Sequence, residues 1–469
     1  MTVTAAGQGA ARAWRATFAD FARLSWPIVL SRVGIQVMGL TDAVVVGHAS
    51  TRQLAFHALG WAPTIVVLVA AVGLLNGVQV MAARRMGEGR PELAGGVLRD
   101  GCVYAGAIGL ATTAALIAFG PGFLLALGLD PGLARGAGRA LQVFALSLTP
   151  YLLATACASW LEGLGRPIPG LVAMWAANAV NLALNLWLVP GGFGVPALGA
   201  VGAGWATLGA RSFLLLGLIV AILRQGDAEA LGVFRPQRPG RAAAREQRRI
   251  GYGAGASYFA EAGAFSGMNV VAGWLGPLPV AAWALAINFS AIVFMLPLGF
   301  AGATAVLVGR AVGAGDPGGV RRAAAVGYGV SAVCALLIAL AVWPAGRAIA
   351  AVYTSDPALV AAAGATLTLG ALFFVPDALQ AVAAQALRAR GDVLKPTLIH
   401  VASYAGLMLP LGWALAHPAR LGLAGCMWAV IVASVVAAGA LLSRFYALAP
   451  RSDAQDPALL SLDLGDPLR

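Results

Sequence analysis

The chain has 469 residues, of which 60% are hydrophobic and only 11% are charged, and its formal net charge is +12. A soluble globular protein carries about 25% charged residues, so this composition excludes a soluble protein and indicates an integral membrane protein. The basic residues do not indicate a nucleic-acid partner, because they are distributed as a membrane topology requires.

Apolar runs of about 20 residues, the length that crosses a bilayer core as a helix, recur along most of the chain. We predict twelve spanning helices. In chain order they are Ser25–Gly47, Ala58–Ala82, Gly96–Phe119, Ala137–Trp160, Ile168–Val189, Leu198–Leu223, Tyr252–Leu275, Val280–Leu307, Ala323–Pro344, Leu359–Leu387, Pro396–Ala416 and Leu421–Phe445.

Lysine and arginine are distributed asymmetrically around these spans. If the N-terminus is cytoplasmic, 24 basic residues lie in inward segments and five in outward loops, while Arg32 and Arg211 fall inside spans. Basic loops are retained in the cytoplasm, so we expect both termini to be cytoplasmic. Residues 1–24 lack the apolar core of a signal peptide, so the first helix is expected to insert the chain into a bacterial inner membrane.

The second half of the chain superposes on the first after a shift of 226 residues. Gly73, Arg84, Gly87, Asp130, Pro150 and Gly165 recur as Gly299, Arg310, Gly313, Asp356, Pro376 and Gly391. Each half contains six helices, an even number, so the two halves share one orientation and form a parallel duplication. We therefore predict an all-α membrane fold of two six-helix lobes.

This organisation also indicates how the protein works. We expect a cytoplasmic segment at residues 1–24, an N-lobe at 25–223, an arginine-rich cytoplasmic linker at 224–250, a C-lobe at 251–446 and a cytoplasmic tail at 447–469. Two similar lobes leave a central cleft, and rocking one against the other exposes that cleft to each side in turn. The sequence thus predicts solute transport by alternating access.

Asp42, Glu261 and Asp377 are the acidic residues inside the predicted spans. A charged carboxylate at mid-membrane costs about 2.5–3.5 kcal/mol on insertion scales, so such residues mark ion, proton or substrate sites. The alternative is a structural acid paired with Arg32 or Arg211. It stays open above all for Asp42, which shares a helix with Arg32.

None of the three acids has an acid at the equivalent position of the other half, where Met268, Ile35 and Tyr151 stand. Glu261 and Asp377 both belong to the C-terminal half and can share one cavity there. Two carboxylates in a desolvated cavity do not both ionise cheaply, so the pair can hold a proton. A Na⁺ bound between them is the alternative, and no other cofactor or metal is expected.

Asn178, Asn181 and Asn185 recur at spacings of three and four, so they line one face of a helix. They either form hydrogen bonds between helices or line a cavity opposite Asp42. The further candidates for lining a substrate cavity are Asn288, Phe373, Phe374 and Gln380. The two phenylalanines either pack in the core or form cation–π walls for a substrate.

The sequence contains no nucleotide-binding loop, zinc-ligand cluster or nucleophile elbow. An enzyme is therefore not expected, and the energy for transport must come from an ion gradient or a partner. The four cysteines lie singly within spans and are expected to be packing residues.

Several motifs combine into a recognisable pattern. They are Met38–Gly47 in the first helix, Asn181-x3-Asn185 followed by Pro196-x-Leu198-Gly199-x2-Gly202, Ala284–Gly299, Glu261, and Pro376–Gln380 followed by Leu387-Arg388. Together they resemble the multidrug and toxic compound extrusion (MATE) transporters, and the second half looks like the NorM-type branch. The resemblance covers residues 20–446. It implies a MATE/MOP-type fold of twelve helices in two lobes and antiport of drugs against cations.

By this resemblance, Asp42 matches the acid of the N-lobe, and Glu261 and Asp377 match the acids of the C-lobe cation site. Two positions depart from the family's pattern. Asn185 stands where a branch that relies on two N-lobe acids has Asp, and Phe373 stands where the NorM-type cation site has Tyr. The first departure weighs against a proton mechanism in the N-lobe. The second weakens the case for Na⁺ over H⁺ as the coupling ion.

We therefore expect a monomeric multidrug exporter, surrounded by membrane lipids, of the kind that confers antibiotic resistance. Its substrates would be cationic or amphipathic organic compounds, exchanged for H⁺ or Na⁺. The alternative within transport is a flippase or exporter of lipid-linked saccharides, which would favour an arginine-rich cavity, and only Arg32 and Arg211 are available. A membrane enzyme would need clustered catalytic groups in a long interfacial loop, whereas the longest loop is merely basic.

Overall fold

The computed structural model describes residues 2–128, 130–235 and 240–448, without the side chains of residues 2–10, and this part of the chain contains helices but no β-strand. The first half comprises α1 (Thr2–Ala49), α2 (Thr51–Leu74), α3 (Asn76–Gly87), η1 (Pro91–Leu93), α4 (Ala94–Ala126), α5 (Pro131–Leu146), α6 (Leu148–Gly163), α7 (Ile168–Leu188) and α8 (Ala200–Leu223). The second half comprises α9 (Arg241–Gly273), α10 (Pro277–Gly313), α11 (Pro317–Tyr353), α12 (Pro357–Gly370), η2 (Ala371–Phe373), α13 (Phe374–Ala389), α14 (Leu394–His400), η3 (Val401–Met408, a π-helix), α15 (Leu409–Ala416) and α16 (Gly422–Ala447).

Eleven helical segments in the described part of the chain are long and apolar enough to cross a membrane. They correspond to eleven of the twelve predicted spans, with several helices running beyond the predicted ends. The twelfth, Tyr252–Leu275, lies in α9 except for its last two residues, and α9 has 33 residues and contacts α2 and α3. Its glycines, serines and Glu261 make α9 less apolar than the other spanning helices. The all-helical, twelve-span fold predicted from the sequence is therefore confirmed.

The duplicated prolines interrupt two equivalent spans. The fourth span is divided into α5 and α6 at Ser147, and the tenth is divided by η2 just before α13. Pro150 and Pro376 lie in the first turn of α6 and α13, and each lacks the N–H that would bond to the carbonyl four residues earlier. The interruption places Asp377 in the first turn of α13, where the positive end of the helix dipole favours a carboxylate.

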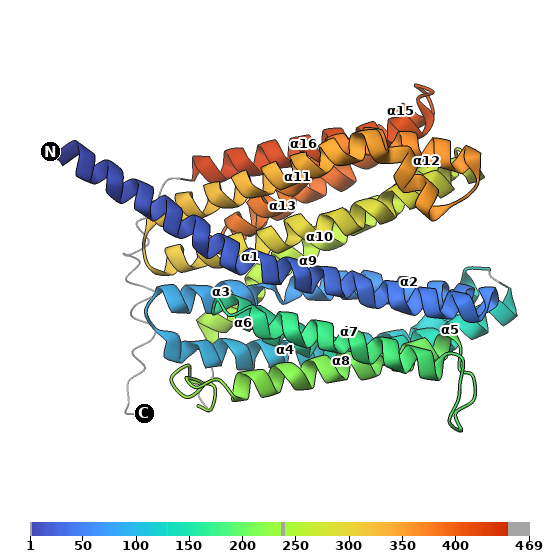
Figure 1. Ribbon diagram of the computed structural model, residues 1–469, viewed down its shortest axis with the longest axis horizontal. Coiled ribbons are helices and arrows are strands. Elements are labelled where there is room, and N and C mark those ends of the chain that lie inside the picture. Colours follow the sequence, from blue (N-terminus) through green and yellow to red (C-terminus); the bar gives the residue numbers. More distant parts are fainter. Residues whose placement is uncertain (1, 129, 236–239, 449–469) are drawn as a thin grey trace.

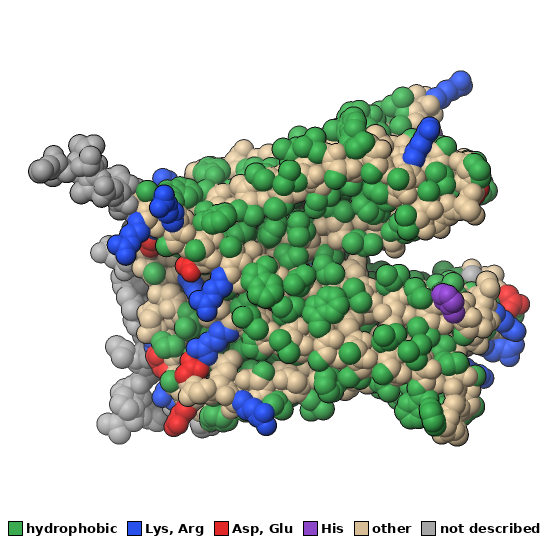
Figure 2. Space-filling view, viewed as in Figure 1, with side chains coloured by type: hydrophobic (Ala, Val, Ile, Leu, Met, Phe, Trp, Pro, Cys, Tyr) green, Lys and Arg blue, Asp and Glu red, His purple; other side chains and the backbone are tan. Residues whose placement is uncertain are grey.

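The two halves of the chain form two lobes joined at one end. The helices of the N-lobe (α1–α8) and those of the C-lobe (α9–α16) gather separately, and the start of α1 and the end of α16 lie at the same end of the molecule (Figure 1). A cleft between the lobes opens at the opposite end and closes toward the end where α1 starts (Figure 2). Helices α1, α2 and α3 of the N-lobe contact α9 and α10 of the C-lobe where the lobes meet.

The closed end is formed by the duplicated glycine–arginine motif. A Cβ atom on Gly87 would overlap the Arg310 carbonyl oxygen, and one on Gly313 would overlap the Arg84 carbonyl oxygen. Only glycine allows the two backbones to approach this closely. Arg84 Nε and Nη2 also donate to the Ala389 carbonyl oxygen across the lobes, at 3.1 and 2.8 Å.

The segments outside the lobes are more helical than the sequence suggested. Helix α1 begins at Thr2, within the expected N-terminal segment, and continues without interruption to Ala49. The expected linker at 224–250 contains turns after Leu223 and then the first turns of α9, which begins at Arg241. Residues 236–239 and most of the expected tail at 447–469 lie outside the described residues.

Candidate functional site

Glu261 and Asp377 come together inside the C-lobe, as the sequence suggested. Glu261 lies on α9 and Asp377 on α13, and Gln380 one turn further along α13 connects them. Its Nε2 atom donates to Glu261 Oε1 at 3.3 Å and to Asp377 Oδ1 at 3.2 Å. Asp377 is 6% exposed, whereas Glu261 is only partly buried. The pair therefore combines one enclosed carboxylate with one more accessible carboxylate.

Further oxygen atoms surround this pair. The Oε1 atom of Gln380 is buried without a hydrogen-bond partner among the described residues. Tyr404 on η3 is fully buried and close enough to both carboxylates to interact with them electrostatically. Sequence reasoning missed this phenol, which comes from a different helix from Phe373. Carboxylate, amide and hydroxyl oxygens are the ligands that hard cations prefer.

Arg388, near the end of α13 that we predict to face the cytoplasm, belongs to a second group of polar side chains in the C-lobe. Its guanidinium lies 5.8 Å from the centre of the Tyr258 ring, and its Nη1 atom donates to Gln385 Oε1 at 3.4 Å. Gln385 Nε2 in turn donates to the Tyr258 hydroxyl at 2.9 Å. The count of basic residues assigned Arg388 to an inward loop, and this assignment is wrong. The side chain is 1% exposed inside the C-lobe, because α13 continues to Ala389 and packs against α10, α11 and α16.

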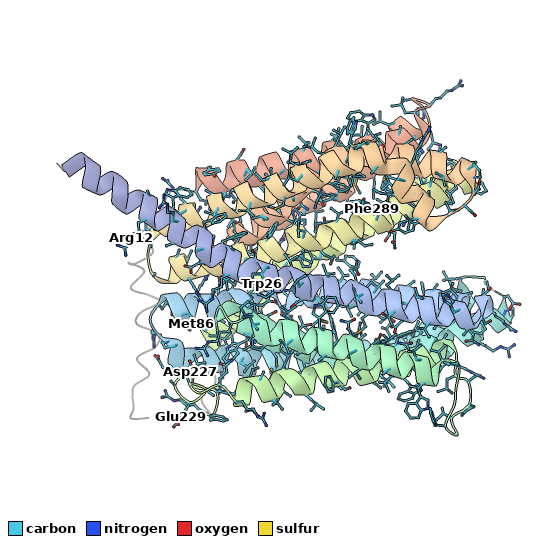
Figure 3. All side chains as sticks on the ribbon, viewed as in Figure 1. Arg12, Trp26, Met86, Asp227, Glu229 and Phe289 are labelled. Atoms are coloured by element: carbon cyan, nitrogen blue, oxygen red, sulfur yellow. The ribbon has the colours of Figure 1, made fainter. Side chains whose placement is uncertain are left out.

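The remaining C-lobe candidates occupy different environments. Phe373 and Phe374 are buried in the core of the lobe, with ring centres 5.1 Å apart. They pack rather than form exposed walls in this conformation, although Phe374 lines a small space beside Asp377. Asn288 is exposed on α10, next to Phe289 (Figure 3). The structure thus brings only Gln380 of these four candidates directly to the acid pair.

Asp42 occupies a separate site within the N-lobe. Its Oδ1 atom accepts hydrogen bonds from the side-chain amides of Asn181 at 2.9 Å and Asn185 at 2.7 Å. Its Oδ2 atom accepts from the Thr207 hydroxyl at 2.6 Å. All four side chains are buried. Three donors aimed at one carboxylate stabilise its ionised form, and the sequence analysis had not identified Thr207.

Asn178, Asn181 and Asn185 of α7 are all buried in the interior of the N-lobe. Asn178 Nδ2 donates to the Gly34 carbonyl oxygen of α1 at 3.0 Å. The side-chain oxygens of Asn178, Asn181 and Asn185 are all buried without a donor among the described residues. Their amides therefore bond α7 to α1, while their oxygens remain available to accept a hydrogen bond or contact a cation.

The two intramembrane arginines do not form an ion pair with Asp42. Arg32 Nη2 lies 3.0 Å from Glu162 Oε2, and Gln79 Nε2 donates to the same oxygen at 2.7 Å. Arg211 donates to the Ser147 hydroxyl and stacks over Tyr151, and it reaches Asp42 only as a longer-range electrostatic interaction.

Glu162 corrects the expectation that only three acids lie within spans. It is 4% exposed near the end of α6, within the spanning segment Pro131–Gly163. The predicted span ended at Trp160, whereas α6 ends at Gly163. The 226-residue shift pairs Glu162 with Arg388, and in both repeats this charged residue is buried near the end of its helix. The sequence did not distinguish these residues from charges beyond the end of a span.

Comparison with known proteins places these features in a family. The sequence profile of the MatE family matches residues 27–187 and 254–414, one stretch in each lobe, in agreement with the duplication. The chain is 54% identical to the probable multidrug resistance protein NorM of Caulobacter vibrioides, over 91% of this chain and 90% of the relative. It is 32% identical to the multidrug resistance protein PmpM of Pseudomonas aeruginosa, over 86% and 84% of the two chains.

Solved structures agree on the fold. The eukaryotic MATE transporter AtDTX14 superposes with a TM-score of 0.86 at 17% identity, covering 96% of this chain and all of that one. A MATE transporter of the MOP superfamily in an outward-facing conformation superposes with a TM-score of 0.84 at 20% identity, covering 92% and 96%. The profile match in both lobes and the close bacterial relatives show that this chain belongs to the MatE family of multidrug and toxic compound extrusion transporters.

Proposed function

We propose that this protein exports cationic or amphipathic organic compounds across the bacterial inner membrane in exchange for H⁺ or Na⁺. The observation that carries the proposal is the C-lobe pair Glu261 and Asp377 joined by Gln380. Acids inside the spanning segments of a membrane protein are costly, and they are characteristic of ion and proton pathways. The names of the relatives NorM and PmpM, both multidrug resistance proteins, support the same class of substrate.

The proposed topology makes this conformation outward-facing. Arg12, Asp227 and Glu229 lie at the end of the molecule where α1 starts (Figure 3), and the basic residues predicted to face the cytoplasm are concentrated there. With that end in the cytoplasm, the cleft between the lobes opens to the outside (Figure 2). In this arrangement the protein, which we take to be a monomer surrounded by lipid, would exchange substrate and coupling ion with the outside.

Coupling follows from competition for the same negative charge. Ionised acids favour binding of a cationic substrate. An entering H⁺ or Na⁺ weakens that binding because it neutralises the acids. If each ligand also favours a different arrangement of the lobes, the ion gradient drives export without ATP. Rocking the lobes about the contacts of α1–α3 with α9 and α10 would then close the outer cleft and open an inner one.

Asp42 is the second coupling candidate. Its three hydrogen-bond donors and the free oxygens of Asn178, Asn181 and Asn185 form a polar site in the N-lobe. We assign the leading role to the C-lobe pair, because two carboxylates share that site, whereas Asp42 is a single carboxylate that already accepts three hydrogen bonds. The asparagines would then bind a cation or line the N-lobe wall only in another conformation.

The proposal is tested by neutral variants of the two C-lobe acids. Glu261→Gln and Asp377→Asn keep the shape of each side chain and remove its charge, so each should reduce gradient-driven efflux at least about tenfold without lowering expression. Efflux is measured in vesicles in which the pH and Na⁺ gradients are collapsed separately. Glu229→Gln is the matched control, because Glu229 is exposed outside the lobes, and it should transport normally.

Wild-type efflux by either acid variant would make that residue structural and move the coupling site to Asp42. If substrate affinity of the wild-type protein does not change with pH or Na⁺, antiport itself is wrong. The saccharide flippase would then be the better hypothesis, although its expected cationic cavity is not favoured by Arg32, which is paired with Glu162.

A further inference from the structure

The buried charges of the N-lobe balance without any added ion. Its interior holds two acids, Asp42 and Glu162, and two arginines, Arg32 and Arg211. Arg32 forms an ion pair with Glu162 at 3.0 Å. Arg211, which is 3% exposed, interacts electrostatically with Asp42. Each acid therefore has an arginine, and the described interior of this lobe carries no net charge.

The C-lobe interior lacks one positive charge. It also holds two acids, Glu261 and Asp377, and one arginine away from the contact between the lobes, Arg388, which interacts electrostatically with Glu261. Arg310 lies at that contact, against Gly87 and Gly165 of the N-lobe, and interacts electrostatically with Asp20 instead. His400 is buried beside Arg388, and neither of its ring nitrogens has a hydrogen-bond partner among the described residues. A buried imidazole without a carboxylate partner is neutral. With Tyr404 also neutral, Asp377 is the acid that no cation balances.

Arg388 is held in place by groups that leave its charge available. Tyr258 and Gln385 contact the guanidinium without neutralising it, and no ion pair between described side chains includes Arg388. Its Nε and Nη2 atoms have no hydrogen-bond partner among the described residues. The side chain therefore acts as an internal counter-charge for the acid pair and not as a member of a closed ion pair.

We propose that Arg388 limits the C-lobe site to one monovalent cation at a time. The inference rests on the proposed antiport function and specifies how many cations the C-lobe site binds at once. Net charge inside a low-dielectric lobe is penalised, so the site binds as many cations as neutralise it. Asp377, Glu261 and Arg388 together carry one net negative charge, which one H⁺, one Na⁺ or one singly charged substrate neutralises. Arg388 is a positioning residue: it contacts Tyr258 and Gln385 and acts on the site through its charge.

The charge count makes an unusual prediction about rescue. Glu261→Gln leaves Asp377 balanced by Arg388, so the lobe should lose its affinity for a cation. Removing Arg388 in the same protein restores one unbalanced negative charge. The double variant Glu261→Gln/Arg388→Gln should therefore bind a cation again. A purely structural role for Arg388 predicts the opposite, since a second buried substitution would add damage.

The test measures equilibrium binding of ethidium and tetraphenylphosphonium, two permanently monovalent cations, to the purified full-length protein. We expect Glu261→Gln to weaken binding at least about tenfold and the double variant to recover at least half of that loss on a logarithmic scale. Glu261→Gln/Arg321→Gln is the matched control, because Arg321 is exposed near the start of α11, and it should bind as poorly as Glu261→Gln. Arg388→Lys keeps the charge and should bind like the wild type.

Two outcomes would overturn the inference: the double variant binds no better than Glu261→Gln, or the Arg321 control recovers equally. If the double variant does not fold, as judged by thermal unfolding, Asp377→Asn/Arg388→Gln makes the same test with the other acid. Failure of the wild-type protein to bind either cation would instead contradict the proposed function, so the two failures are distinguishable.

Discussion

Asp42 is stabilised inside the N-lobe by donors from two other helices. Asn181 and Asn185 come from α7 and Thr207 from α8. The Thr207 hydroxyl is the sole donor to Oδ2 among the described side chains. Without it, that oxygen would be buried with an unsatisfied charge.

We therefore predict that Thr207→Val destabilises the protein by about 1–3 kcal/mol, the cost of an unsatisfied buried polar group. Valine has nearly the same shape as threonine, so packing is conserved. Thermal unfolding of the purified variants measures the effect, and Thr207→Ser, which keeps the hydroxyl, should be close to the wild type. Equal stability of Thr207→Val would mean that Asp42 does not depend on this hydrogen bond.

Between elements, a charged pair connects two turns of the N-lobe that we predict to face the cytoplasm. Arg166, between α6 and α7, donates from Nη1 to Asp227 Oδ1 at 2.7 Å and to Gln225 Oε1 at 2.8 Å. The hydrogen bond from Arg166 lowers the pKa of Asp227 below its ordinary value. The pair lies in the exposed region after α8, so its contribution is no more than about 1 kcal/mol.

The lowered pKa determines the direction of a pH dependence. A carboxyl whose pKa is lower in the folded state stabilises the fold above its unfolded pKa, and this stabilisation is lost as the pH falls through the folded pKa. The wild type should therefore unfold at a higher temperature than Asp227→Asn at pH 7, and the difference should shrink as the pH falls below about 4. A difference that stays constant down to pH 3 would show that the charge of Asp227 plays no part.

For the whole molecule, the shape with a cleft open at one end depends on how closely the lobes approach at the other end, where Gly87 and Gly313 lie. Gly87 and Gly313 allow this approach, because a side chain on either would overlap the backbone of the other lobe. Gly313→Leu should therefore disfavour the closed arrangement and shift the population toward one in which these ends separate. Gly329→Leu is the matched control, because no atom lies within reach of a Cβ atom there.

Spin labels on Glu88 and Ala314, both exposed beside this contact, measure the separation in a background without the four native cysteines. We expect one short distance in the wild type and in Gly329→Leu, and an added longer distance in Gly313→Leu. An unchanged distance distribution in Gly313→Leu would show that the glycine contact does not hold the lobes together.

The sequence alone determined the class of the protein, its span count and its duplication. The reason is that bilayer thickness imposes a length and an apolar composition on every span, and these are local properties. The three candidate acids were recognisable for the same reason, since Asp42, Glu261 and Asp377 interrupt apolar runs. The proximity of Glu261 and Asp377 was inferred from their common half and is observed through Gln380.

Only the tertiary structure decided which partner each buried charge has. Arg32 meets Glu162 across 130 positions of sequence, and Tyr404 approaches the acid pair from a helix that no motif connected with it. Such contacts depend on the rotation and lateral packing of helices, which helical periodicity does not specify when most faces are apolar. The burial of Arg388 had the same origin: in sequence it resembles a cytoplasmic loop residue, and its enclosure comes from the helices packed around the end of α13.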